Sequence, residues 1–148
     1  MNPEQVMPSK PENCAETSPR IVTVRAAEAS DSKQALPLFF GVSGRSAGAK
    51  GISMYKVVIP PGAVAEPHSH KDFETAIYVI KGRVETRFGP GLRDSVVNGP
   101  GDFVYIPPGL PHQPVNLSDS EPAEAIVARN DPSEQENVVP YDPDVGTA

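Results

Sequence analysis

The sequence of 148 residues contains no tryptophan, five phenylalanines, four tyrosines and a single cysteine. Because Cys14 has no second cysteine to pair with, the chain cannot form an internal disulfide. Because aromatic residues are few, we expect a core built mainly from valine, isoleucine, leucine and alanine. No apolar run approaches the ~18 residues that a membrane-spanning helix needs, and the chain does not open with a basic region followed by an apolar stretch. The sequence therefore predicts a cytoplasmic protein that has no signal peptide and no membrane partner.

Positive charge is also scarce, and the formal net charge is −6 at pH 7. The acidic excess belongs largely to the C-terminal end, where residues 131–148 hold five acidic residues and no lysine or arginine. Binding of nucleic acid requires a dense positive patch that neutralises phosphates. We therefore expect no nucleic-acid partner and a small-molecule substrate or ligand instead.

Proline and glycine, by contrast, are abundant, with 18 and 12 residues. Between residues 52 and 130, short β-branched and apolar segments alternate with turn residues, and a turn recurs roughly every 8–12 residues. This pattern argues against a helical bundle and is typical of a small antiparallel β-sandwich or barrel. We predict an all-β fold in which residues 21–130 form one domain. A flexible arm at residues 1–20 and an acidic tail at residues 131–148 flank it.

Several segments outside this repeating region carry their own predictions. Residues 20–25 are rich in β-branched side chains and predict a first strand, and residues 38–42 predict a second. Residues 26–34 favour a helical turn or two. The glycine- and serine-rich residues 41–51 predict a mobile loop that is a candidate lid or an ordinary connection. The acidic tail is expected to pack loosely or to cover a neighbour.

All three histidines fall in two short segments. His68 and His70 are separated by one residue, and on an extended strand such residues point to the same face. Glu74 follows four residues later, and His112 comes about forty residues further on. Three imidazole nitrogens and a carboxylate suit a divalent first-row metal. On their own, the paired histidines are as easily a coincidence as a metal site.

The surroundings of His112 favour the metal site. Gly101, Pro107 and Gly109 precede this histidine and Asn116 follows it. Glycine and proline restrict the backbone to a defined turn, which is how a ligand is placed on a rigid support. The two segments together predict a metal centre that contains all three histidines.

The two segments resemble the two sequence motifs of the cupin superfamily, and in particular small single-domain metal-binding cupins of the RmlC-like type. The first motif runs from Gly62 to Gly82 and the second from Gly101 to Asn116. The resemblance covers about residues 52–130. It implies a small antiparallel β-barrel of jelly-roll type, and a homodimer formed through an extra N-terminal strand, for which residues 21–24 are the candidate.

The resemblance also implies one metal inside the barrel, held by His68, His70, Glu74 and His112. Iron or manganese comes first, and nickel, cobalt, copper and zinc are alternatives. Glu74 departs from the common pattern, however, because seven residues rather than six separate it from Gly82. A one-residue shift turns a strand side chain to the opposite face. Either a β-bulge restores Glu74 to the site, or three histidines and water hold the metal.

Other residues are weaker candidates. Asp72 and Glu66 are substitutes for the missing carboxylate oxygen. The candidate catalytic residues are Tyr55, Tyr78 and Gln113. The candidate substrate-binding residues are Phe73, Tyr105 and Arg129, of which the arginine suits an anionic substrate. For each of these six, packing in the core or at a strand edge is the competing interpretation.

Three functions remain open at this point. The first is a metal-dependent oxidoreductase of dioxygenase type acting on a small organic molecule, because a metal with three or four protein ligands keeps positions for substrate and O2. The second is a Lewis-acid isomerase, lyase or decarboxylase. The third is a non-catalytic cupin that binds a small ligand or a metal.

Overall fold

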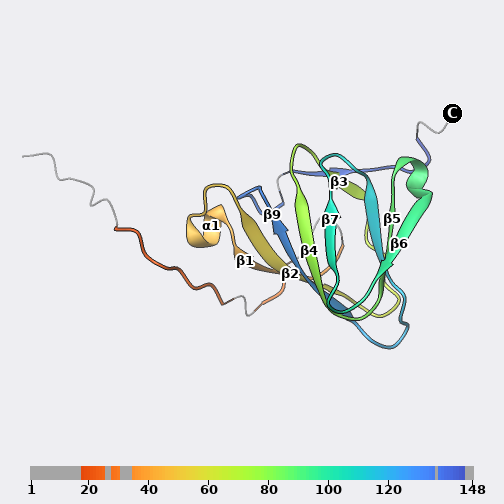
Figure 1. Ribbon diagram of the computed structural model, residues 1–148, viewed down its shortest axis with the longest axis horizontal. Coiled ribbons are helices and arrows are strands. Elements are labelled where there is room, and N and C mark those ends of the chain that lie inside the picture. The colour runs from red at the N-terminus through yellow and green to blue at the C-terminus, as the bar shows by residue number, and fades with distance from the viewer. Residues whose placement is uncertain (1–17, 26–27, 31–34, 136, 146–148) are drawn as a thin grey trace, which may run out of the picture.

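The computed structural model describes residues 18–25, 28–30, 35–135 and 137–145. Within these residues the chain is almost entirely β-structure, with one short α-helix and one 3-10 turn (Figure 1). The elements, in chain order, are β1 (Leu38–Val42), α1 (Gly44–Ala47), β2 (Ser53–Ile59), β3 (His68–His70), β4 (Thr75–Lys81), β5 (Val84–Phe88), η1 (Pro90–Leu92), β6 (Asp94–Asn98), β7 (Phe103–Ile106), β8 (His112–Asn116), β9 (Ala123–Arg129) and β10 (Val138–Pro140).

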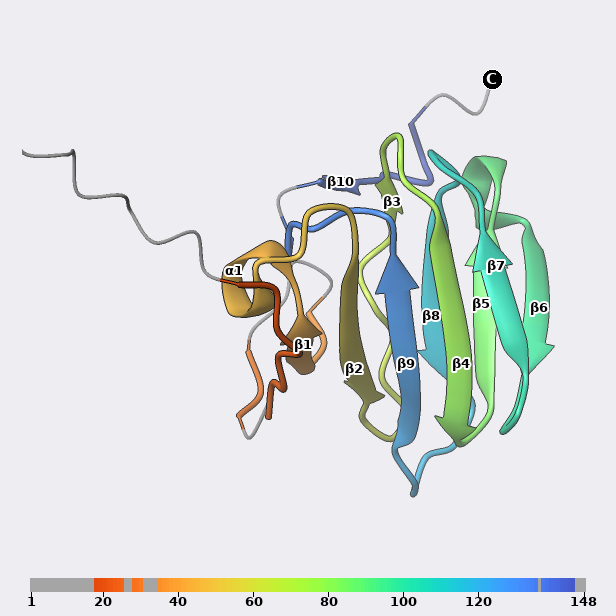
Figure 2. The same ribbon diagram turned by 60° about the vertical axis from the view of Figure 1, so that its left-hand side comes forward.

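The strands form two five-stranded sheets that face each other (Figure 2). The first sheet has the order β1-β2-β9-β4-β7 and the second has the order β10-β3-β8-β5-β6. Neighbouring strands in both sheets are antiparallel. The predicted all-β, antiparallel fold of jelly-roll type is confirmed. The two sheets make a sandwich rather than a fully closed barrel.

Alternation of side chains along the strands builds the core between the two sheets. In β2 and β9, every second residue is buried, because successive side chains of a strand point to opposite faces. The buried cluster is aliphatic apart from one tyrosine, as the composition predicted, and includes Leu38, Tyr55, Val57, Ile59 and Val127.

Two motif residues have structural roles at the ends of strands. Gly82 has φ +87°, and a Cβ atom at this position would lie 2.8 Å from the Cβ of Ala123. Only glycine meets both conditions without strain. The Asn116 side-chain amide donates to the carbonyl oxygens of Ile59, Pro60 and Glu121 at 3.0, 3.2 and 2.8 Å. Asn116 therefore ties three loop carbonyls together and does not face a ligand.

The N-terminal strand predicted for residues 20–25 is wrong, because the chain there runs without strand pairing. Ile21 is 97% exposed, so its side chain packs against neither sheet. The proposed dimerising strand at residues 21–24 is therefore not formed in the chain by itself. Of the predicted helical turn at 26–34, residues 26–27 and 31–34 lie outside the described residues, and Ser30 forms a β-bridge with Leu38.

The segment predicted as a loop at residues 41–51 contains the helical turn α1. Ser43 caps it, because its Oγ accepts a hydrogen bond from the backbone N–H of Ser46, and Gly48 closes the turn with φ 70°. Ser43 and Ser46 form a capping box, a local signal for a helix start that the glycine content of the segment does not reveal. In the described part of the chain, no helix has the length and apolar character needed to cross a bilayer.

The C-terminal tail is built into the sandwich, contrary to the prediction of loose packing. β10 pairs with β3, so that Val138 lies opposite His70 and Pro140 opposite His68. The backbone N–H of Tyr141 then donates to the Pro67 carbonyl at 3.0 Å. The hydrogen-bonding edge of β3 needs a partner, and residues 138–141 supply it.

Candidate metal centre

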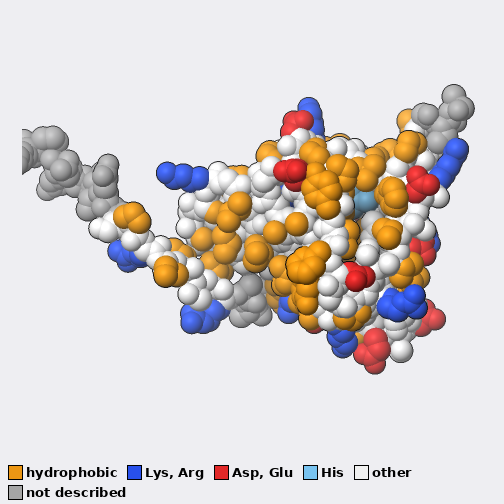
Figure 3. Space-filling model, in the orientation of Figure 1, with side chains coloured by type: hydrophobic (Ala, Val, Ile, Leu, Met, Phe, Trp, Pro, Cys, Tyr) orange, Lys and Arg blue, Asp and Glu red, His pale blue; other side chains and the backbone are white. Residues whose placement is uncertain are grey.

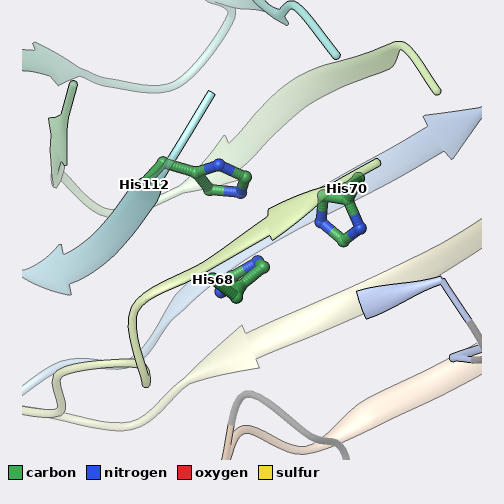
Figure 4. Close-up of side chains that lie close together, drawn as sticks. All are labelled: His68, His70 and His112. Atoms are coloured by element: carbon green, nitrogen blue, oxygen red, sulfur yellow. The ribbon is translucent and has the colours of Figure 1, made fainter. Parts of the chain in front are cut away.

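The three histidines meet between the sheets (Figure 4). His68 and His70 come from the same face of β3, and His112 lies at the start of β8, directly opposite His68. Each of the three is at most 5% exposed. One ring nitrogen from each histidine lies within 4.8 Å of the corresponding nitrogens of the other two. The predicted convergence of the histidines is therefore present in the structure.

Backbone carbonyls orient two of the three rings. The Nδ1 atom of His68 lies 2.8 Å from the Glu66 carbonyl oxygen, and Nδ1 of His112 lies 2.9 Å from that of Leu110. A carbonyl oxygen only accepts, so Nδ1 carries the proton in both rings and Nε2 keeps its lone pair. A neutral imidazole with a free Nε2 and an anchored Nδ1–H is the form that binds metals.

The environment keeps the three rings uncharged. Burial and then the neighbouring His112 lower the pKa of His68 to about 3. Burial and then the positive charge of Arg129 lower the pKa of His70 to about 2. Burial also lowers the pKa of His112. Three neutral, converging imidazoles fit a divalent first-row metal, which requires deprotonated ligands.

Glu74 does not join this cluster. It precedes β4 by one residue, so it shares the outer face of the first sheet with Ala76. Its carboxylate is exposed and accepts hydrogen bonds from the Tyr105 hydroxyl at 2.9 Å and from the Asn130 amide at 3.5 Å. The register shift in β4 lies between Val79 and Lys81, at the opposite end of the strand, and does not turn Glu74 inward. The groups that the structure brings together are the three histidines.

The inward position at the start of β4 belongs to Thr75, which is 2% exposed. It pairs across the sheet with Arg129 of β9, whose Nε donates to Thr75 Oγ1 at 3.1 Å. Nη2 of the same arginine donates to the Tyr55 hydroxyl at 2.7 Å and lies 3.3 Å from Nε2 of His70. A guanidinium therefore faces the histidines from the first sheet.

The histidines, Arg129, Thr75 and Tyr55 line one cavity of about 70 Å³ between the sheets. Most of its remaining wall is aliphatic. The wall includes Leu36, Val57, Ile77, Val104, Ile106 and Val127. A small apolar cavity with a few convergent polar groups at one end is typical of a small-molecule site. In Figure 3 part of a histidine, in pale blue, is visible between hydrophobic side chains, although the histidines are buried.

Of the weaker candidates, the structure brings Tyr55 and Arg129 to the histidines and places the others elsewhere. Tyr78 lies on the outer face of β4, where the centroid of its ring is 4.9 Å from the centroid of the Phe103 ring. Tyr105 is 60% exposed, and its hydrogen bond to Glu74 raises its pKa.

The side chain of Gln113 points away from the histidines and donates to the Ala65 carbonyl at 3.0 Å. Phe73 is half-buried in the turn before β4 and is not among the described residues that line the cavity. The two substitutes for a carboxylate ligand, Glu66 and Asp72, are both exposed.

Thr75 is the site residue that sequence reasoning passed over. The alternation of Thr75, Ile77 and Val79 with Ala76 and Tyr78 indicates which set faces inward, and Thr75 belongs to the inward set. A polar residue at the head of an inward-facing apolar series was the available signal.

Comparison with known proteins agrees with this geometry. A family model described as a cupin domain matches residues 55–129. The chain belongs to the cupin superfamily. A germin-like protein of Arabidopsis thaliana, subfamily T member 3, is 42% identical to this cupin over 88 residues, which are 57% of this chain and 38% of that protein. This cupin thus spans well under two thirds of that relative.

Two solved structures show the same fold. Oxalate decarboxylase of Bacillus subtilis, described with Mn(II) centres, superposes with a TM-score of 0.64 at 22% identity, over 76% of this cupin and 29% of that chain. The polyketide cyclase RemF of Streptomyces resistomycificus superposes with a TM-score of 0.61 at 22% identity, over 82% of this cupin and 80% of that chain. At this identity the likeness establishes the fold, while the reaction depends on this cupin's own residues.

Proposed function

We propose that this cupin is a metal-dependent enzyme that acts on a small organic molecule, and that the reaction is an oxidation of dioxygenase type. The observation that carries the proposal is the set of three neutral histidines that converge beside a small apolar cavity. His68, His70 and His112 would hold the metal. Iron or manganese is the first choice, and nickel, cobalt, copper and zinc are alternatives.

The exclusion of Glu74 from the cluster supports oxidation. A six-coordinate ion with three protein ligands, when bound, keeps open positions at which a substrate and O2 can lie side by side. The aliphatic wall keeps bulk water away from those positions, which protects reactive species from side reactions. Tyr55 and Arg129 hold and orient the polar end of the substrate.

A non-redox reaction is the second candidate, and it too has a specific observation behind it. The solved structures with this fold include a decarboxylase and a cyclase. In such a reaction the metal polarises the substrate, and the buried guanidinium of Arg129 stabilises negative charge that develops in the cavity. The two candidates need the same ligands and differ in their need for O2.

Metal content is the first experiment. Elemental mass spectrometry of protein purified without a histidine tag should find about one first-row metal ion per chain. His112→Ala should lose the metal and keep the fold, whereas Gln113→Ala, its neighbour on the same strand, should keep both. Wild-type protein without stoichiometric metal after reconstitution with iron, manganese or zinc would refute the proposal.

Oxygen dependence separates the two reactions. With the iron or manganese form, an oxygen electrode should record uptake when enolic, phenolic or dicarbonyl compounds are added. Turnover of such a compound at an unchanged rate under anaerobic conditions would replace the oxidation with the non-redox reaction. Metal and ligand binding without turnover would leave the third function, a non-catalytic binding cupin.

We also propose that the chain forms a homodimer. The support is the outer face of the first sheet, where Phe103 is 84% exposed, Tyr105 60% and Tyr78 40%. Figure 3 shows hydrophobic side chains gathered over the β4 and β7 face. Light scattering on a sizing column should give twice the chain mass, and Phe103→Lys should shift the protein to the monomer. A monomeric wild-type protein would contradict the proposal.

A further inference from the structure

Arg129 is a buried cation that has no acidic partner in the described part of the chain. Arg129 is 5% exposed. The ion pairs among the described residues join Lys81 to Glu121 and Arg87 to Glu85, and neither involves Arg129. A buried charge is costly unless an opposite charge accompanies it. This arrangement needs an explanation beyond packing.

The partners that Arg129 does have are neutral. Thr75 Oγ1 and the Tyr55 hydroxyl accept from Nε and Nη2, and the Tyr55 ring lies 5.4 Å from the guanidinium carbon. These contacts orient the guanidinium without neutralising it. Asp131 is the nearest acid along the chain, but its two oxygens accept from Ser133 and Asn137 instead.

Part of the hydrogen-bonding capacity of Arg129 faces the cavity. No hydrogen bond joins Nη1 to any described residue. Among the described residues, the one fully buried side-chain polar atom without a hydrogen-bond partner is Ser53 Oγ. Nη1 is therefore not fully buried, and Arg129 lines the cavity. The Tyr55 hydroxyl accepts from Arg129, so its own proton remains available to a further acceptor.

The contact between Arg129 and His70 adds to this demand. Nη2 of Arg129 lies 3.3 Å from Nε2 of His70. Because a guanidinium only donates, Nε2 carries the lone pair of this ring, which is the lone pair that would ligate a metal. One lone pair cannot serve both an N–H donor and a metal ion. When His70 ligates a metal, an N–H of Arg129 is released, and a second positive charge enters the same cavity. An anion is the ligand that satisfies both charges.

We propose that Arg129 and Tyr55 form a receptor for the carboxylate of a small aliphatic acid, with Thr75 holding the guanidinium in place. This inference deepens the proposed function and rests on it for the metal beside the receptor. The cavity of about 70 Å³ has room for about five water-sized groups. Its aliphatic wall suits a short hydrocarbon chain. The substrate class is therefore a carboxylic acid of a few carbon atoms rather than a sugar or a nucleotide.

The test compares acids with their neutral amides of the same size. Acetate, propionate and butyrate, with acetamide, propionamide and butyramide, are titrated into the metal-free and the zinc-loaded protein and followed by NMR. Zinc keeps the site occupied without redox chemistry. At least one acid should bind the zinc-loaded protein at least about tenfold more tightly than its amide, which is the factor that one charge-assisted hydrogen bond supplies.

Three variants assign that preference to its source. Arg129→Gln should lose most of the acid preference while it retains zinc, and Arg129→Lys should keep part of the preference because it keeps the charge. Arg83→Gln, the same change at an exposed arginine, should behave as wild type. Tyr55→Phe should weaken acid binding several-fold and amide binding less, and it provides the test if Arg129→Gln does not fold.

Two results would overturn the receptor. One is that none of the acids binds better than its amide to wild-type protein. The other is an acid preference that is undiminished in folded, zinc-loaded Arg129→Gln, or acid binding that is unchanged in Tyr55→Phe, because the metal alone would then hold the carboxylate. Failure of the protein to bind zinc would count against the proposed function instead, and acid preference in the metal-free protein would still report on Arg129.

Discussion

Replacement of Glu74 by glutamine tests the composition of the metal centre most directly. The substitution keeps the size of the side chain and removes its charge. In the structure this charge is exposed and bound to Tyr105 and Asn130 on the outside of the sandwich. We therefore expect Glu74→Gln to keep a full complement of metal, whereas His70→Gln loses it.

The magnitudes of the two effects differ clearly. The attraction between an exposed carboxylate and a metal inside the sandwich acts through solvent and amounts to about 1 kcal/mol or less. The metal dissociation constant of Glu74→Gln should therefore rise by no more than about fivefold. Loss of the His70 imidazole should exceed about 100-fold, since even residues that only support a ligand contribute 10–100-fold.

The assay is a competition between the protein and a chromophoric chelator for zinc, with both variants and the wild type measured side by side. The same protein offers an internal check, because the hydrogen bond to Glu74 raises the pKa of Tyr105. In Glu74→Gln, NMR of labelled tyrosine should show that this pKa falls toward its ordinary value. Weakening of zinc binding by Glu74→Gln to the level of His70→Gln would refute the reasoning and return the carboxylate to the metal.

Three further predictions concern stability. Gly82→Ala forces a Cβ onto a backbone with φ +87°, 2.8 Å from the Cβ of Ala123, and should lower the free energy of unfolding in urea by at least about 1–2 kcal/mol; an unchanged midpoint would contradict the close approach. Asn116→Ala removes the donor to three carbonyl oxygens and should cost about 1–3 kcal/mol by the same measurement, while metal affinity should hold in the folded fraction. The folded pKa values of His68 and His70, about 3 and about 2, lie below the unfolded value of 6.5. As the pH falls below 6.5, the unfolded chain of the metal-free protein takes up these protons before the folded chain does. Each histidine should therefore lower the free energy of unfolding by up to about 1.4 kcal/mol per pH unit below 6.5, and should have no such effect above that pH. Urea midpoints that stay constant down to about pH 5 would refute the burial of neutral rings.

Local patterns in the sequence were sufficient for most of the sandwich. Turn residues that recur between short apolar segments predicted the strands from residue 52 to residue 130, and the spacing of His68 and His70 predicted that both rings face one way. These features depend only on near neighbours in the chain. The convergence of His112 with them was predicted from the cupin motifs, because two segments forty residues apart share a site only through the fold.

The remaining features depend on contacts that a single segment does not encode. Residues 20–25 are rich in β-branched side chains, yet they pair with no strand of either sheet. Residues 138–140 are ordinary in composition and become β10 because the edge of β3 is open. Arg129 looked like an edge residue of the last strand, and the pairing of β9 with β4 turns it toward the histidines. For β10 and for Arg129, the neighbouring strand in the sheet determines the structure that forms.

The pairing of β3 with β10 has a consequence for the geometry of the histidine cluster. β3 carries two of the three histidines and is three residues long, and its pairing with β8 is confined to His68 and His112. Its other edge is covered by residues 138–140, near the C-terminus. Two of the three histidines therefore lie on a strand that is held mainly by residues 138–140, so that loss of this pairing would disturb the geometry of the centre.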